Sequence, residues 1–162
     1  MRPIERQAMV LVAATLIADQ ASKQLLLGYL ATKTGAVVPV IDGFFRLVMV
    51  FNRGVSFGLF DGAEGAVPAW LLSAIAVAVC IGLFVWLRRT DRALTGWGIG
   101  LVMGGAIGNV IDRARWGAVF DFADFHIGHW HWPAFNVADS AIVIGVALML
   151  IDSLVGERQR AP

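Results

Sequence analysis

Residues 66–87 read AVPAWLLSAIAVAVCIGLFVWL, and residues 93–111 read ALTGWGIGLVMGGAIGNVI. Neither run contains a charged side chain. A helix needs about 20 consecutive, mainly apolar residues to cross the hydrocarbon core of a bilayer. Both runs therefore predict membrane-spanning helices, and they place the chain among the mainly α-helical membrane proteins.

The composition of the whole chain agrees with this class. Hydrophobic residues make up 58% of the chain and charged residues 15%, with a mean hydropathy of +0.72. An ordinary soluble domain is only about 45–50% apolar. The formal net charge of +1 and the scattered basic residues argue against a nucleic-acid partner. The single cysteine, Cys80, excludes an internal disulfide and is expected to be a small buried hydrophobe.

Two further segments, 8–30 and 134–155, have the length of a span but carry charges. The charged residues are Asp19, Lys23, Asp139 and Asp152. A charge inside a bilayer is costly unless it faces the protein interior or a cavity, so both segments are expected to turn a polar stripe inward. The chain then has four predicted spans. Because no repeat, low-complexity tract or linker interrupts it, residues 1–162 are expected to form a single domain.

Arginines indicate the orientation of the spans. They flank the first span, fill the turn between the second and third spans and follow the fourth: Arg2, Arg6, Arg88, Arg89, Arg92, Arg158 and Arg160. The positive-inside rule predicts that these regions are cytoplasmic, with both termini inside. The longer connections, residues 31–65 and 112–133, are then expected on the outer face of the membrane.

The first outer connection has the pattern of a β-hairpin. Residues 37–41 and 44–51 are rich in β-branched and aromatic side chains, and the turn signal Asp42-Gly43 separates them. A small sheet on the outer surface is expected here, and a loop that dips into the membrane interface is the alternative. The second outer connection carries aromatic residues typical of the membrane–water boundary: Phe120, Phe122, Phe125, Trp130 and Trp132.

Polar residues from three of the spans converge at the outer end of the predicted bundle. They are Asp19 and Lys23 in the first span, Asn109 and Arg113 in the third, and Asn136, Asp139 and Ser140 in the fourth. Within each segment a spacing of three or four residues puts them on one helix face. Asp121, in the connection before the fourth span, brings a second carboxylate to the same end. These residues are expected to form one site.

Five sequence blocks, taken in order, resemble the motif set of the prolipoprotein signal peptidases, also called signal peptidase II. The blocks are D-Q-x-x-K at 19–23, NRGVSFG at 52–58, GGAIGNVIDR at 104–113, VFDF at 119–122 and PAFNVADS at 133–140. They extend from the first span to the last, so the resemblance covers nearly the whole chain. Phe120 stands where the family often has valine, which keeps the position apolar.

The resemblance implies an aspartyl endopeptidase of the bacterial cytoplasmic (inner) membrane, with its active site at the outer face. It implies that Asp121 and Asp139 are the catalytic pair. It implies that a further set of residues shapes the site and holds the substrate: Asn52, Gly54, Asn109, Arg113 and Asn136. It also implies that Asp19 and Lys23 have a supporting role. The implied substrates are prolipoproteins that already carry a diacylglyceryl group on the cysteine after the cleavage point. It implies globomycin-type cyclic peptides as inhibitors. It also implies that the outer sheet and its neighbouring loop form a cradle and a lid over the peptide.

The residue types suit this chemistry. Hydrolysis of a peptide without a metal or a nucleophilic side chain needs one group that takes a proton from water and another that donates a proton. Two close carboxyl groups cannot both ionise easily, so they share one proton and supply both roles near neutral pH. No cofactor and no metal are expected for this mechanism.

Two other functions fit parts of the pattern. His126, His129 and His131 could ligate zinc in a metalloprotease, although the segment lacks the helical His-Glu-x-x-His arrangement. Ionisable residues within spans also mark ion pathways, as in a small transporter or a proton-relay protein.

Three further carboxylates are expected to lie outside the catalytic pair. Asp112 is expected to be a partner of Arg113 or a cap, Asp124 a solvated or hydrogen-bonded residue, and Asp152 an interfacial residue.

Overall fold

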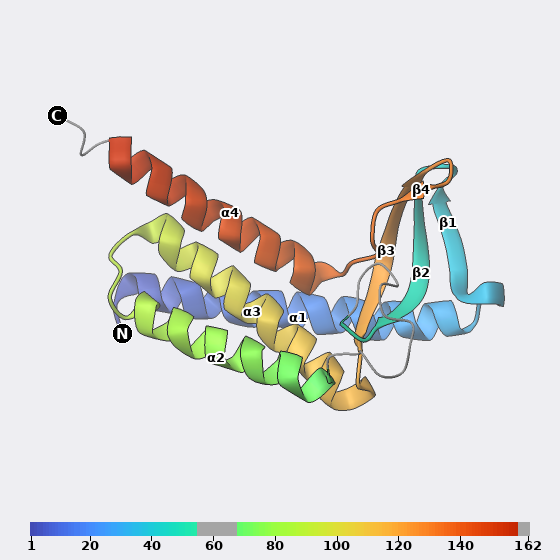
Figure 1. Cartoon of the computed structure of the whole chain (residues 1–162), viewed down its shortest axis with the longest axis horizontal. Helices are drawn as coiled ribbons and strands as arrows, with labels where there is room; N and C mark the ends of the chain where they lie inside the picture. The colour runs from blue at the N-terminus through green and yellow to red at the C-terminus, as the bar shows by residue number, and fades with distance from the viewer. Residues whose placement is uncertain (55–67, 159–162) are drawn as a thin grey trace.

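Four long helices form the body of the molecule, and a small sheet lies at one end of them (Figure 1). This computed structural model describes residues 1–54 and 68–158, and side chains up to residue 155. The helices are α1 (Pro3–Ala31), α2 (Ala69–Leu87), α3 (Ala93–Trp116) and α4 (Val137–Arg158). Each is long and apolar enough to cross a membrane. The prediction of four spans is therefore confirmed.

The helix boundaries differ from the predicted spans for local reasons. α1 begins at Pro3, where proline's missing N–H costs nothing because the first N–H groups of a helix have no partner within it. α3 continues past residue 111 to Trp116 and ends at Gly117, whose φ of 69° stops the helix. α4 begins at Val137 rather than at residue 134, since the preceding Phe135 pairs with a strand.

The sheet has four antiparallel strands in the order β1 (Val37–Ile41), β2 (Phe45–Asn52), β3 (Val119–Ile127) and β4 (Trp130–His131). The predicted strands at 37–41 and 44–51 correspond to β1 and β2, so the prediction of a small sheet is confirmed for these residues. The strands β3 and β4 were not predicted. Two aspartates and an alanine weaken the local strand signal of β3, and its partner β2 is far away in the sequence, with Val50 opposite Asp121.

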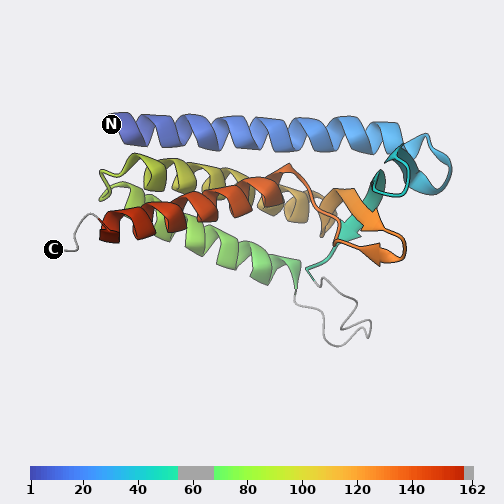
Figure 2. The same ribbon diagram turned by 90° about the horizontal axis from the view of Figure 1, so that it is seen from above.

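Helix α3 is the centre of the bundle and packs against α1, α2 and α4 (Figure 2). Glycines allow these close approaches. A Cβ on Gly104 would lie 2.9 Å from the carbonyl oxygen of Val12 in α1, and a Cβ on Gly105 would lie 2.4 Å from that of Ala138 in α4. The small residues of α3 therefore serve helix packing, because they let the neighbouring helices approach closely.

The two ends of the bundle differ in character. The N-terminus of α1, the α2–α3 turn and the end of α4 lie together, away from the sheet (Figure 1). There Arg2 pairs with Asp91 at 2.7 Å, and Arg92 pairs with Asp152 at 3.0 Å. Asp152 is thus an ion-pair partner that is only 8% exposed. The predicted lid, residues 55–58 of the second motif block and the first two residues of the predicted span 66–87 lie outside the described residues.

Candidate functional site

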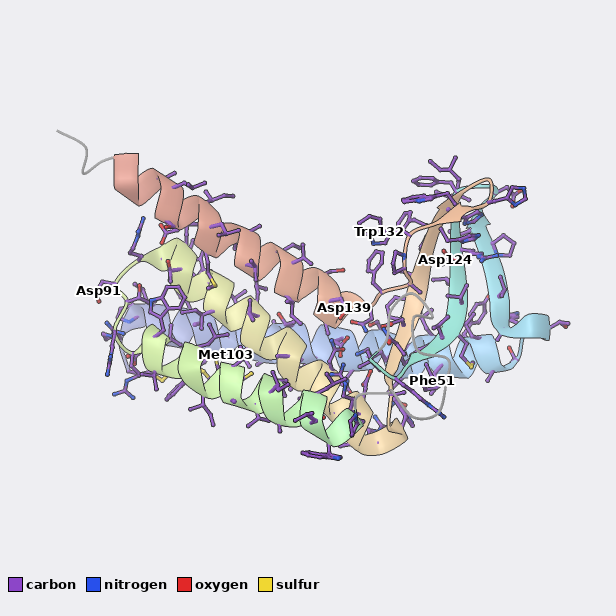
Figure 3. All side chains as sticks on the ribbon, viewed as in Figure 1. Phe51, Asp91, Met103, Asp124, Trp132 and Asp139 are labelled. Atoms are coloured by element: carbon purple, nitrogen blue, oxygen red, sulfur yellow. The ribbon has the colours of Figure 1, made fainter. Side chains whose placement is uncertain are left out.

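The polar residues predicted to converge do meet, where the sheet joins the ends of the helices. Asp121 comes from β3 and is 2% exposed. Asp139 comes from the first turn of α4, where Figure 3 shows it facing the sheet. One carboxylate is therefore carried by a strand and the other by a helix. Their relative position depends on the residues that join these two elements.

Asn136 joins the two carboxylates directly. Its side-chain Nδ2 donates to Asp121 Oδ1 at 2.7 Å, and its backbone N–H donates to Asp139 Oδ2 at 3.2 Å. In return its Oδ1 accepts the backbone N–H of Asp139 at 3.0 Å. This reciprocal pair is a capping box, so Asn136 starts α4 and positions both acids at once.

Two more asparagines bind the remaining carboxylate oxygens. Asn52 Nδ2 donates to Asp121 Oδ2 at 3.1 Å, and Asn109 Nδ2 donates to Asp139 Oδ1 at 2.9 Å. Each of the four carboxylate oxygens thus accepts a hydrogen bond from a neutral amide. Neutral donors orient the carboxyl groups without adding a positive charge that would force both of them to ionise.

The electrostatic environment favours one shared proton. Burial, and after it the charge of Asp139, raise the pKa of Asp121 from 3.8 to about 7. The hydrogen bonds from Asn52 and Asn136 act in the opposite direction, because they favour the ionised form. Asp121 can therefore hold a proton at neutral pH beside a second carboxylate, as acid–base catalysis by a pair requires.

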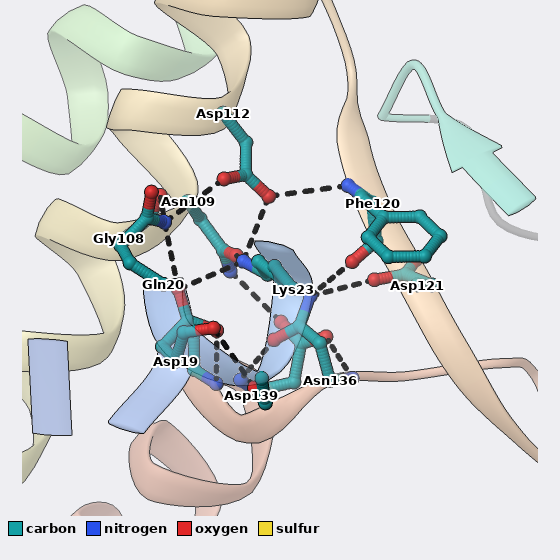
Figure 4. A network of polar contacts seen from close by, with 12 residues as sticks. Asp19, Gln20, Lys23, Gly108, Asn109, Asp112, Phe120, Asp121, Asn136 and Asp139 are labelled. Atoms are coloured by element: carbon teal, nitrogen blue, oxygen red, sulfur yellow. Dashed lines mark hydrogen bonds and ion pairs between the residues drawn. The ribbon is translucent and has the colours of Figure 1, made fainter. Parts of the chain in front are cut away.

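Lys23 lies at the centre of a buried network behind the two acids (Figure 4). Its side chain is 0% exposed, and Nζ lies 2.9 Å from Asp19 Oδ2, 2.7 Å from Asp112 Oδ2 and 3.3 Å from Asn109 Oδ1. The predicted pairing of Asp19 with Lys23 is present. The network joins α1 to α3 and reaches Asn109, which holds Asp139.

Asp112 belongs to this network, although it was expected to pair with Arg113 or to cap a helix. It is 0% exposed and pairs with Lys23. Its Oδ2 also accepts the backbone N–H of Phe120 at 3.2 Å, which fixes the strand just before Asp121. The expectation was wrong because adjacent helical residues point in different directions. The spacing of Asn109 and Asp112, three residues apart, was the signal that could have found it.

Asp19 and Gln20 extend the network to α4 and α3. Asp19 Oδ1 accepts the backbone N–H of Ala138 at 3.0 Å, which connects α1 to the first turn of α4. Gln20 Nε2 donates to Asp112 Oδ1 at 3.0 Å and lies 3.4 Å from the carbonyl oxygen of Gly108. Gln20, a member of the D-Q-x-x-K block without a predicted role, therefore links α1 to α3.

Arg113 and Gly54 complete the predicted set. Arg113 Nε is buried and has no hydrogen-bond partner among residues 1–54 and 68–158, while Nη1 lies 3.5 Å from the carbonyl oxygen of Asn109. Gly54 donates its N–H to Asn52 Oδ1 at 2.9 Å with a φ of 100°. A Cβ there would lie 2.2 Å from Leu72 Cδ1. The positive φ favours glycine at this position, and a side chain there would also require Leu72 to move.

Asp124 and the histidines lie elsewhere on the sheet. Figure 3 places Asp124 apart from Asp139, and its carboxylate contacts Arg46 at 2.5 Å and His131 at 3.1 Å. Burial acts to raise the pKa of Asp124, but these hydrogen bonds outweigh burial and hold its pKa below the ordinary value. Asp124 is therefore hydrogen-bonded outside the carboxylate pair, as expected.

Comparisons with known proteins agree with the motif resemblance. Residues 11–155 match the family model described as signal peptidase (SPase) II. The chain is 49% identical over 150 residues to a lipoprotein signal peptidase of Methylorubrum extorquens, covering 92% of this chain and 86% of that one. It is 44% identical over 154 residues to one from Caulobacter vibrioides, covering 94% and 89%. A solved bacterial membrane enzyme superposes with a TM-score of 0.78 at 29% identity, covering 95% of this chain and 91% of that one.

Replacing Lys23 by methionine should destabilise the folded protein strongly. The change leaves the buried carboxylates of Asp19 and Asp112 without their cation, which costs about 3–5 kcal/mol. Thermal unfolding of the purified protein in detergent measures the loss, and Lys33→Met at an exposed position is the matched control. Adding Asp112→Asn to Lys23→Met should recover part of the stability. Equal unfolding temperatures for the two lysine variants would contradict a structural role for this network.

Proposed function

The chain belongs to the signal peptidase II family, and we propose that Asp121 and Asp139 are the two carboxyl groups with which it cleaves its substrate. As an aspartic-type membrane peptidase it removes signal peptides from prolipoproteins. The observation that carries the proposal is the hydrogen-bonding of both acids by the same residue, Asn136, with one acid able to stay protonated near pH 7.

In the proposed mechanism the pair carries one proton. The ionised carboxylate takes a proton from water, and the water oxygen attacks the carbonyl carbon of the scissile bond. The protonated carboxyl group donates its proton to the carbonyl oxygen. When the C–N bond breaks, the proton taken from water passes to the leaving amine and the other proton returns to the pair. The pair is then ready for another cycle.

Arg113 and Asn52 are proposed to position the peptide. The buried Nε of Arg113 is a donor without a partner among the described residues. Arg113 lies on α3, four residues after Asn109, which donates a hydrogen bond to Asp139. Donors that are already in place stabilise negative charge on a reacting carbonyl oxygen without reorganisation. Gly54 is proposed to keep the chain close to Asn52, whose Oδ1 accepts its N–H.

The substrate is proposed to be the diacylglyceryl-modified prolipoprotein, cleaved immediately before the lipidated cysteine. The site lies at the end of the spanning helices, so a lipid anchor can remain in the bilayer while the peptide reaches the acids. Pulling acyl chains into water would cost about 0.8 kcal/mol per methylene. In a gel assay the lipidated precursor should be cleaved far faster than the unmodified one, and globomycin-type peptides should inhibit. Equal rates would rule out lipid recognition.

Changing either acid to asparagine should abolish cleavage and leave expression and membrane insertion intact. Asparagine preserves the volume but cannot exchange a proton, and the loss of acid–base catalysis is worth about 10²–10⁴-fold in rate. The double variant should be no worse, because residues that act as a unit lose their effect with the first change. Asp91→Asn, at the opposite end of the bundle, is the matched control (Figure 3). Substantial activity of purified Asp121→Asn or Asp139→Asn on lipidated substrate would disprove the aspartyl mechanism.

The rate should fall on both sides of a pH optimum. Because the pKa of Asp121 is raised to about 7, the one-proton state persists up to about that pH and is lost as the pH rises through it. At acidic pH the pair takes up a second proton and the base is lost. The Asn52 hydrogen bond lowers the pKa of Asp121, so Asn52→Ala should move the alkaline limb to higher pH. An unchanged or lower alkaline limb would contradict this assignment. Measured values belong to the pair as a whole.

The enzyme is proposed to lie in the bacterial cytoplasmic (inner) membrane, with its termini in the cytoplasm and the acids at the outer face. Support comes from the N-terminal end of α1 and the α2–α3 turn, two arginine-bearing segments that lie together at the end away from the sheet (Figure 1), where Arg2 pairs with Asp91.

Cysteine labelling in intact cells tests this orientation. In a Cys80→Ala background, Asp42→Cys in the exposed β1–β2 turn should react with a membrane-impermeant thiol reagent, and Asp91→Cys should be protected. Asp91 is preferred to the neighbouring Thr90 because Thr90 is only 7% exposed, so burial alone would protect a cysteine there from the reagent. The reverse labelling pattern would overturn the orientation and the outer-face site together.

A further inference from the structure

We propose that Asp124, His126 and His131 form a binding site for a zinc-type divalent metal ion on the sheet, separate from the catalytic acids. Sheet geometry places the three side chains together. Asp124 and His126 are two residues apart on β3 and therefore point to the same face. His131 on β4 is the direct cross-strand partner of His126. The imidazole rings stack with centroids 5.1 Å apart and an interplanar angle of 18°.

The donor atoms of the three residues are close enough to share an ion. All of them lie within 4.8 Å of one another, and His131 Nδ1 lies 3.1 Å from Asp124 Oδ1. Ligand atoms on a tetrahedral zinc ion at about 2.1 Å are roughly 3.4 Å apart. The widest separation must therefore shorten by at most about 1.4 Å, which rotation of the partly exposed histidine rings can supply.

His126 carries an unsatisfied donor or acceptor at this place. Its Nδ1 is buried and has no hydrogen-bond partner among residues 1–54 and 68–158. Buried polar atoms without partners are uncommon, and a binding site for an ion is one of the explanations for them. A metal ligated by this nitrogen would satisfy it, which the ion pair of Asp124 with Arg46 does not.

Arg46 occupies one side of Asp124 and leaves the other side for a metal. Its Nε contacts Oδ2 at 2.5 Å, whereas Oδ1 faces His131. Carboxylates that ligate metals usually also accept a hydrogen bond from a neighbouring residue, and this bond orients them. A bound ion would replace the hydrogen bond of 3.1 Å between His131 Nδ1 and Asp124 Oδ1 and the longer contact of 3.5 Å between Arg46 Nη2 and His131 Nδ1.

The ligand set favours zinc among common divalent ions. Two imidazoles and one carboxylate match zinc sites that keep a fourth position for water, whereas calcium and magnesium prefer oxygen ligands alone. Asp124 and His131 line a hollow of about 400 Å³ that leaves room for this water. The three residues make no hydrogen bond to Asp121 or Asp139 among the described residues, so the site is independent of the proposed catalytic mechanism.

A metal here would fasten β4 to β3. The chain after β4 returns to β3 at Phe135, whose carbonyl oxygen accepts the N–H of Ala123 at 2.9 Å, and then reaches Asn136 and α4. Binding of a ligand to the folded state alone raises its stability. Zinc should therefore raise the unfolding temperature of the full-length protein.

The test uses Zn²⁺ alone and full-length protein in detergent, purified without a polyhistidine tag. After equilibration with Zn²⁺ and dialysis, elemental analysis should find about one zinc per chain for the unaltered protein. His126→Ala and His131→Ala should each bind zinc at least about tenfold more weakly, since even the loss of an outer partner of a ligand costs that much. The matched control is His129→Ala, an exposed histidine of the same hairpin, which should bind normally.

Thermal unfolding separates a lost ligand from a misfolded variant. Without zinc, the three histidine variants should unfold close to the unaltered protein, and His131→Gln, which can still hydrogen-bond to Asp124, serves as a second probe if His131→Ala does not fold. With zinc, only the unaltered protein and His129→Ala should gain stability. No zinc bound to the unaltered protein, or equal binding by His126→Ala and His129→Ala, would overturn the proposal.

Discussion

The buried ion pairs of Lys23 are the interaction on which the rest of the site depends. Lys23 holds Asp19 and Asp112 at 2.9 and 2.7 Å inside the bundle. Asp19 then binds the N–H of Ala138 at the start of α4, and Asp112 binds the N–H of Phe120 in β3. The two elements that carry the acids are thus fixed to one lysine. Removing such a cation costs more than its contacts suggest, because two carboxylates remain unpaired in a dry interior.

The acids themselves are held differently from this supporting layer. Lys23 binds charged partners, whereas Asp121 and Asp139 accept hydrogen bonds from the neutral groups of Asn52, Asn109 and Asn136. Full ionic pairing of the acids would keep both ionised and leave no proton to donate. The stabilising ion pairs are therefore separate from the two acids that are proposed to react. Charge compensation lies one layer behind the acids, and neutral amides surround them.

The helices and the first hairpin could be predicted from the sequence because their signals are local. An uncharged run such as 93–111 specifies a span by itself, and Asp42-Gly43 marks the turn between β1 and β2. The motif order also predicted residues that the structure brings together, such as Asp121, Asn136 and Asp139. The strand β3 could not be predicted, since its pairing with β2 joins distant segments, Val50 with Asp121. Asp112 was misread for a similar reason, because its partner Lys23 lies in another helix.

The double use of Asn136 restricts which residues can replace it. Serine, threonine, aspartate and asparagine all begin helices well, because each offers an oxygen to a free N–H. Only asparagine among them also offers an amide N–H, which Asn136 directs to Asp121 while its oxygen caps α4. Aspartate would instead introduce a third negative charge beside the pair. Selection for folding alone would accept several residues at this position, whereas selection for turnover accepts one, so substitutions here would distinguish the two pressures in a mutational scan.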